Sequence, residues 1–275
     1  MKRLFYANFA RLFNNWVFWI NSGILLVYAA VYMLNGCRQE RSGLVGVHVL
    51  EDYYFQFAMF IGLFSGVFTT LYLSVEYSDG VLKNKIIAGH TREEIYLSNL
   101  FFTFFVSLFM ACMGCLGGLV GIPTFGTFGM GGFPALCNLL IMVMFLFAFS
   151  AVFTMVAMLS PNKAVGAVVT ILAFFLMLFA ASIMSNRLGE PEMVSDTLIT
   201  ENGITFSDPK PNPRYVDGMA REVLDFAVDL LPAGQGMRLA MGEAKNPVRM
   251  LLSSVFVSGF VTWGGIFLFR RKNLK

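Results

Sequence analysis

The sequence predicts an all-α, polytopic membrane protein with six transmembrane helices in a single domain over residues 1–275. Of these residues, 57% are hydrophobic and 13% are charged, which is about half of the charged share of a soluble domain. A span needs about 20 apolar residues, and several uncharged stretches reach that length. The longest one, between Glu94 and Lys163, has room for two spans and a glycine-rich turn. These observations predict spans near residues 16–36, 54–76, 95–120, 135–159, 164–185 and 249–269.

A short basic segment precedes the first span. Residues 1–15 combine Lys2, Arg3 and Arg11 with apolar side chains, a pattern typical of an interfacial helix that lies along the membrane surface. The same start could imitate a signal peptide. Because no small-residue cleavage site follows, we expect the first span to be retained.

The Lys and Arg residues of the loops predict the orientation. With the N-terminus inside, the cytosolic segments carry 11 basic and four acidic residues, and the outer segments carry nine basic and 13 acidic residues. Cytosolic loops are enriched in Lys and Arg. We therefore expect both termini to lie in the cytosol.

Residues 186–248 form the predicted outer segment. Its first half contains three prolines and is typical of loop or short strands. Asn212-Pro213 then gives an N-cap followed by proline at the first helical position. Apolar residues repeat at helical spacing from there to Pro232, which predicts an amphipathic helix on the outer leaflet or over the bundle. Asn246-Pro247 gives the same start signal before the last span.

Glycines recur four residues apart within the predicted spans. The pairs are Gly62 with Gly66, Gly114 with Gly118, and Gly117 with Gly121. In lipid such pairs allow two helices to approach closely. The approach could occur within the bundle or between two copies of the chain.

The chain carries no recognisable catalytic or metal-binding motif. It lacks the phosphate-binding loop G-x-x-x-x-G-K-[ST], and His48 and His90 are isolated in the sequence. The span interiors hold no ionisable residue; Asn21 and Asn138 are the most polar residues there, as interhelical hydrogen-bonding groups or as part of a pathway. Proton-coupled carriers keep ionisable groups in their spans. Any transport must therefore draw its energy from outside the membrane domain.

A polar loop at residues 77–94 joins the second and third spans. We expect a short helix from about Gly80 to Ala88, ending at Gly89 because glycine adopts the left-handed conformation at little cost. Thr91 and Glu94 have the spacing of a capping box, so a second helix starts at once and continues into the third span. The loop is either a rigid lever for a cytosolic partner or a charged connector that only sets topology.

The residues of this loop resemble the signature of ABC-2 type transporter permeases, the membrane subunits of ATP-binding-cassette exporters. The resemblance rests on Glu76-Tyr-Ser-Asp-Gly80, Lys83-Asn-Lys85, Gly89-His-Thr-Arg92 and Ile95-Tyr96. The order of the parts also matches this family, and Leu231-Pro-Ala-Gly-Gln235 is similar to its segment ahead of the last span. Asn99 departs from the pattern, since many members carry a basic residue there.

The resemblance implies that the loop carries a coupling helix, which docks in a cleft of a separate ATPase subunit. Glu76, Gly80, Gly89 and Arg92 are then expected to hold the shape of the loop. Lys83 and Lys85 are expected to meet the ATPase surface, with apolar contact supplied by Val81, Leu82, Ile86 and Ile87. Two ATPase subunits, which bind ATP and Mg²⁺, and a second permease chain are the implied partners, with membrane lipid around them and no nucleic acid.

The family expectation is a permease in the plasma membrane of a bacterium, without catalytic activity or a bound cofactor of its own. The apolar spans favour an amphipathic peptide, an antibiotic or a lipid-like molecule as substrate. A non-transporting sensor or immunity subunit that associates with an ABC ATPase has the same sequence features and remains the alternative.

Overall fold

The computed structural model of the protein describes residues 8–42, 49–78, 81–160, 162–195, 197–200 and 203–272. Six long helices dominate it: α2 (Trp16–Ser42), α4 (Ile61–Ser78), α6 (Arg92–Gly118), α8 (Gly132–Leu159), α9 (Lys163–Gly189) and α12 (Pro247–Arg271). Shorter helices are α3 (Glu51–Tyr54), η1 (Gln56–Met59), α5 (Val81–Ile87), η2 (Leu119–Gly121), α7 (Ile122–Phe125), α10 (Gly218–Leu230) and α11 (Pro232–Ala240). The all-α class is confirmed.

Six helical segments are long and apolar enough to cross a membrane. They match the six predicted spans in number and order, with shifted ends. The first helix continues to Ser42 rather than ending near residue 36. The second is not continuous, because α3 and η1 precede α4 with a turn at Phe60. Of the predicted interfacial segment, residues 8–12 are helical, and residues 1–7 lie outside the described part.

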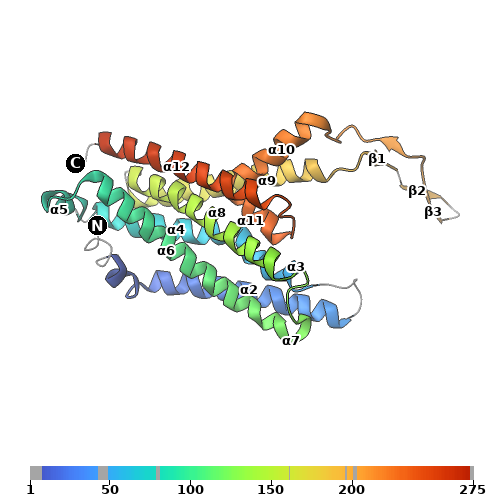
Figure 1. Ribbon diagram of the computed structural model, residues 1–275, viewed down its shortest axis with the longest axis horizontal. Coiled ribbons are helices and arrows are strands. Elements are labelled where there is room, and N and C mark those ends of the chain that lie inside the picture. The colour runs from blue at the N-terminus through green and yellow to red at the C-terminus, as the bar shows by residue number, and fades with distance from the viewer. Residues whose placement is uncertain are drawn as a thin grey trace.

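The long helices run side by side along the length of the molecule (Figure 1). α2 packs on α6, α6 on α8, and α8 on α12, while α4 packs on α8 and α9. The helical turn at residues 8–12, α5 and the last turn of α12 lie at one end of the bundle, and the strands extend from the other end (Figure 1). This arrangement separates the predicted coupling loop from the predicted outer segment by the full length of the spans.

Two small antiparallel sheets follow α9. β1 (Met193–Val194) pairs with β4 (Lys210–Pro211), with Met193 opposite Pro211. β2 (Thr197–Thr200) pairs with β3 (Gly203–Phe206), with Thr197 opposite Phe206. The predicted loop or short strand in this region is therefore confirmed.

The helix predicted to start at Asn212-Pro213 starts later, and the prediction of its first residue is wrong. Residues 213 and 214 form a turn, and α10 begins at Gly218. The Asn212 amide donates hydrogen bonds to the Glu190 carboxylate and the Pro191 carbonyl, so it fastens the return strand to the end of α9. Its side-chain oxygen accepts from the Arg214 amide, which closes the turn. α10 ends before Pro232 as expected, but Pro232 itself starts α11.

Glycines of α4 allow close packing against phenylalanines of α8. The rings of Phe149 and Phe153 are stacked with centroids 5.4 Å apart. A Cβ atom built on Gly62 would lie 2.5 Å from the Phe149 ring, and one on Gly66 would lie 2.6 Å from the Phe153 ring. Both glycines therefore serve packing within the bundle.

Replacement of Gly66 by alanine should destabilise the α4–α8 contact. The added methyl group has to displace an aromatic ring in a packed core, which costs about 1–3 kcal/mol. We expect G66A to lower the thermal unfolding midpoint of the detergent-solubilised chain. The matched control is G23A on α2, where nothing lies within 4 Å of the new Cβ atom. Equal midpoints for G66A and G23A would contradict the packing role.

Candidate functional site

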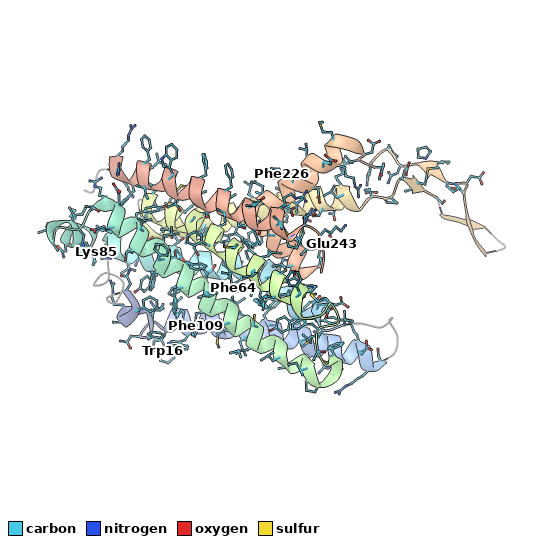
Figure 2. All side chains as sticks on the ribbon, viewed as in Figure 1. Trp16, Phe64, Lys85, Phe109, Phe226 and Glu243 are labelled. Atoms are coloured by element: carbon cyan, nitrogen blue, oxygen red, sulfur yellow. The ribbon has the colours of Figure 1, made fainter. Side chains whose placement is uncertain are left out.

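The predicted coupling loop contains α5, a short helix at the end of the bundle where α12 ends (Figure 1). α5 runs over Val81–Ile87, within the predicted range. Gly80 and the side chain of Glu76 lie outside the described residues. Figure 2 shows Lys85 on this helix, at the extreme end of the molecule.

The side chains of α5 divide into an exposed set and a buried set. Ile87 is 83% exposed and Lys83 is also exposed. Leu82 is only 3% exposed and packs in a small core with Ile95, Tyr96, Met158 and Phe269. Ile86, half-buried, packs against the same core, and Val81 and Lys85 are half-buried as well. Leu82 therefore attaches α5 to the bundle. The prediction that the Leu82 side chain contacts a partner is wrong, because that side chain is buried in the small core.

Gly89 forms the joint between α5 and α6. Its φ of 89° lies in the left-handed region, as predicted. The His90 amide donates to the Lys85 carbonyl and the Gly89 amide to the Ile86 carbonyl, the two hydrogen bonds of a Schellman motif. The helix therefore ends in a defined conformation.

The predicted capping box at the start of α6 is present. The Thr91 hydroxyl accepts from the Glu94 amide at 3.2 Å, and the Glu94 carboxylate accepts from the Thr91 amide at 3.2 Å. His90 also pairs with Glu94 at 3.5 Å. Only Ala88, Gly89 and His90 lie between the end of α5 and the capping residue Thr91, so the connection between the two helices is short and ordered by hydrogen bonds.

Arg92 connects the start of α6 to the end of α12. Its Nη1 atom donates to the carbonyl groups of Phe269, Arg270 and Lys272, at 3.1, 2.6 and 2.7 Å. The last carbonyl groups of a helix lack partners in that helix, and a cation there interacts favourably with the negative end of the helix dipole. Arg270 also pairs with Glu93. Arg92 thus fixes the end of α12 to the loop. The sequence did not predict α12 as the partner of Arg92.

Lys272 makes a similar contact with the next helix. Its Nζ atom donates to the carbonyl groups of Met158 and Ser160, at 3.0 and 2.9 Å, at the end of α8. Burial lowers the pKa of this amino group. The ends of α8 and α12 and the start of α6 are therefore connected around α5 by two basic side chains.

The asparagines expected to bridge helices bond locally. Asn21 donates to the Val17 carbonyl of its own helix, and Asn138 donates to the Met130 sulfur in the turn before its own helix. Hydroxyl pairs join neighbouring helices instead: Thr70 with Thr170, Thr103 with Thr154, and Ser107 with Ser150. Asn99, where the family pattern has a basic residue, accepts from the Asn8 amide.

A cluster of four charged residues lies at the opposite end of the bundle, where α10, α11 and α12 meet. Arg238 donates to Asp229 and to Asp225, each at 2.5 Å. Arg249 donates to Asp229 at 2.5 Å and also to Asp225. Asp229 is fully buried, and the Arg238 side chain is 5% exposed. We call these residues the outer ion cluster.

Charge compensation explains how the outer ion cluster is tolerated. A buried charge is costly unless it is paired and hydrogen-bonded, and here two carboxylates face two guanidinium groups. Burial raises the pKa of the Asp229 carboxyl against the attraction of Arg238 and Arg249. Burial also opposes ionisation of Asp225, but hydrogen bonds from Arg249 and Arg238 outweigh it and lower the pKa of Asp225.

The outer ion cluster turns the polar face of α10 inward. Asp225 and Asp229 point to the arginines, whereas the apolar Met219, Val223 and Phe226 are exposed. Figure 2 shows Phe226 on this helix beside α12. The sequence carried one signal of this arrangement, because two acids four residues apart repel each other on a helix unless a cation lies between them.

α11 lies in the same region and is buried along its whole length, Pro232–Ala240. Its polar groups are satisfied by neighbouring elements. Gln235 donates to the carbonyl groups of Asp229 and Met250 and accepts from the Ser254 hydroxyl. Gln56 donates to the Ala240 carbonyl at the end of α11. The Leu231–Gln235 segment noted in the sequence therefore belongs to the start of a buried helix, which is hydrogen-bonded to α10 and α12.

Comparison with known proteins adds no relative: neither the protein-family models nor the curated proteins match this chain. Within the described residues, no group of three or more His, Cys, Asp or Glu side chains is placed to hold a metal ion.

Replacement of Arg92 by methionine should loosen the end of α12. Hydrogen bonds to charged groups contribute about 1.5–3 kcal/mol, so the last turn should open more often. We expect faster amide hydrogen exchange at residues 269–272 in R92M than in the unmodified chain. R187M is the control, because Arg187 is exposed in the last turn of α9. Unchanged exchange in R92M would contradict the contact.

Replacement of Arg238 by methionine should strongly destabilise the chain. Breaking a buried ion pair from one side costs about 3–5 kcal/mol, because the remaining charge stays buried without its partner. R214M, at an exposed arginine, should unfold like the unmodified chain. Adding D229N to R238M should recover part of the loss in thermal unfolding. A double variant less stable than R238M alone would contradict this account.

Proposed function

We propose that the chain is the membrane-spanning permease subunit of an ABC exporter, which forms the translocation pathway and couples to a separate ATPase through residues 77–94. The observation that carries the proposal is α5, an exposed helix that projects from one end of a six-helix bundle. Its exposed side chains are those of Lys83, Asn84 and Ile87. The buried side chain of Leu82 attaches α5 to the bundle.

The loop has the construction that force transmission requires. α5 ends at Ile87 in a Schellman motif, and the capping box at Thr91, four residues after Ile87, starts α6 at Arg92. A displacement of α5 therefore moves the start of α6 rather than being absorbed by a flexible connector. A loop that only sets topology needs its positive charge but none of this geometry, so the geometry favours the lever interpretation.

A displacement of α5 can reach the opposite end of the bundle through α12, which is held at both of its ends. At one end Arg92 holds its last carbonyl groups. At the other end Arg249, in its first turn, belongs to the outer ion cluster with α10 and α11. ATP-driven closure of two ATPase subunits would thus reach the outer segment of each of two permease chains. ATP and Mg²⁺ bind in the ATPase partners, and this chain has no enzymatic role.

An amphipathic peptide, an antibiotic or a lipid-like molecule remains the substrate class we favour. The support is a groove of about 570 Å³ between α10 and the start of α12. Its walls include Phe226, Leu230, Leu252 and Phe256, and Arg249 lies at its side. Such a surface suits a ligand with an apolar body and a polar end.

The proposal places the chain as a multi-pass protein in the plasma membrane of a bacterium, with α5 and both termini in the cytosol. The second permease is either an identical chain or a paralogue. A sensor or immunity subunit would bind the same ATPase through the same loop. The two roles separate when export is measured with the assembled complex.

Charge and polarity changes on the exposed side of α5 should abolish coupling without unfolding the chain. We expect K83E with I87E to lose the ATPase subunit during co-purification, or to retain it with transport-coupled ATP hydrolysis reduced more than tenfold, since interface anchors cost about 2 kcal/mol or more. The combined K83E and K85E variant should also lose coupled hydrolysis and still insert in the membrane.

The control is K245E, an exposed lysine at the opposite end of the bundle, which should couple normally. L82A should instead lower the thermal unfolding midpoint, because Leu82 is in the core. If no ATPase subunit co-purifies with the unmodified chain, or if K83E with I87E exports normally, the coupling proposal is wrong. ATPase association without any export would favour the sensor or immunity role.

A further inference from the structure

α10 (Gly218–Leu230) presents an apolar face away from the rest of the chain. Met219, Val223 and Phe226 lie on one side of this helix at helical spacing. Their side chains are 81%, 59% and 47% exposed. Contiguous exposed apolar side chains mark a surface that meets a partner or a membrane. The face therefore needs an apolar environment that the chain itself does not supply.

The outer ion cluster fixes the direction in which this face points. Asp225 and Asp229, on a different side of α10, are paired with Arg238 and Arg249. A rotation of α10 that brought its apolar side chains onto the bundle would separate these largely buried charges, which is costly. The apolar face is therefore held outward.

The groove of about 570 Å³ between α10 and α12 joins this face to a spanning helix. Phe226 and Leu230 of α10 form one wall, and Leu252 and Phe256 of α12 form the other. Among the described residues of the lining, Arg249 carries the charge, and its guanidinium is paired with the two carboxylates of the outer ion cluster. The groove therefore offers apolar surface with compensated charge, which suits a hydrocarbon chain.

The α12 wall of the groove continues into an exposed aromatic side of the same helix. Exposed rings follow Phe256 along α12, with neighbouring centroids 6.2–6.5 Å apart, at Phe260, Trp263 and Phe267. α12 is one of the six helices long and apolar enough to cross a membrane, so the solvent of its exposed apolar side is lipid. The groove and the apolar face of α10 extend this lipid-facing surface.

The length of the groove matches one leaflet of a bilayer. Along α12 its lining extends from Asn246, which precedes the helix, to Phe256. Ten residues of α-helix rise about 15 Å, and half of the hydrocarbon core of a bilayer is also about 15 Å thick. Figure 1 shows α10 beside α9 and α12, within the length of the six long helices, whereas the strands extend beyond them. The groove therefore begins where α12 enters the membrane and ends near its middle.

We propose that α10 lies in the membrane leaflet farther from α5, with Met219, Val223 and Phe226 in contact with acyl chains, and that the groove holds an acyl chain of a lipid in that leaflet. Amphipathic helices at a membrane surface bury their apolar face in this way. α10 differs from them because its two aspartates face arginines of the chain itself. A permease and a sensor would bury α10 in the membrane alike.

The test is electron paramagnetic resonance of the full chain in phosphatidylcholine liposomes, with one spin label at a time. The four native cysteines are first replaced by alanine. Molecular oxygen concentrates in the hydrocarbon core and a nickel chelate stays in water, so their collision rates with the label report its surroundings. We expect oxygen to exceed nickel at M219C, V223C and L252C, as at F260C on the exposed side of α12. At E222C, which lines a polar pocket between α9 and α10, nickel should exceed oxygen.

Three outcomes would overturn the proposal. Nickel above oxygen at positions 219 and 223 would place the apolar face of α10 in water. Protection of both positions from both reagents would show that protein covers the face, as in an assembly of two chains. Oxygen at these positions but nickel at position 252 would show a groove filled with water. The thermal unfolding midpoint of each variant should equal that of the cysteine-free chain, because the replaced side chains are exposed. Position 248, also exposed in the groove, replaces position 252 if a label there lowers the midpoint.

Discussion

The hydrogen bonds from Arg92 to the last carbonyl groups of α12 are the contact on which the rest of the structure depends. The guanidinium donates to the carbonyl groups of Phe269 and Arg270 in the last turn of α12 and to that of Lys272 just after it. The Phe269 carbonyl also accepts from the Lys272 amide. Because Arg92 is the first residue of α6, the contact joins the loop after α4 to the final helix. Leu82 of α5 packs against Phe269 of α12 in the same place. α5, α6 and α12 therefore meet as one unit at this end of the bundle.

The opposite end of α12 is fixed by a different kind of interaction. Arg249 enters the outer ion cluster, where two carboxylates and two guanidinium groups compensate one another in a largely buried site. A buried ion pair adds little net stability compared with apolar packing, but the loss of one partner is costly. The cluster therefore acts mainly to specify how α10, α11 and α12 fit together. α12, Pro247–Arg271, thus extends from the outer ion cluster at one end of the bundle to the contact with Arg92 at the other.

Local sequence signals predicted local structure well. Gly89, Thr91 and Glu94 gave the joint and the cap, because both motifs depend on residues within one or two turns. The lengths of the uncharged stretches predicted the six long helices, because this signal also lies within one continuous segment of the sequence. The contacts of Arg92 and Arg249 join residues from about 20 to 180 positions apart, and no local pattern carries that information. At Asn212-Pro213 only a turn forms, closed by the Asn212 side-chain oxygen, while the Asn212 amide donates to Glu190, 22 residues away, a contact that no local pattern predicts. Leu82 and Ile87 were equivalent in sequence, and only the packing of α6, α8 and α12 separates the anchor from the exposed residue.

The most direct test of the central claim is photocrosslinking from α5 in the complete membrane complex. A benzophenone amino acid is placed at position 87, where the side chain is exposed, and separately at position 219, exposed on α10 at the other end of the bundle. We expect a crosslink from position 87 to an ATPase subunit and none from position 219. A complex that forms without a crosslink from position 87, or that crosslinks equally from both positions, would contradict the assignment of α5 as the coupling helix.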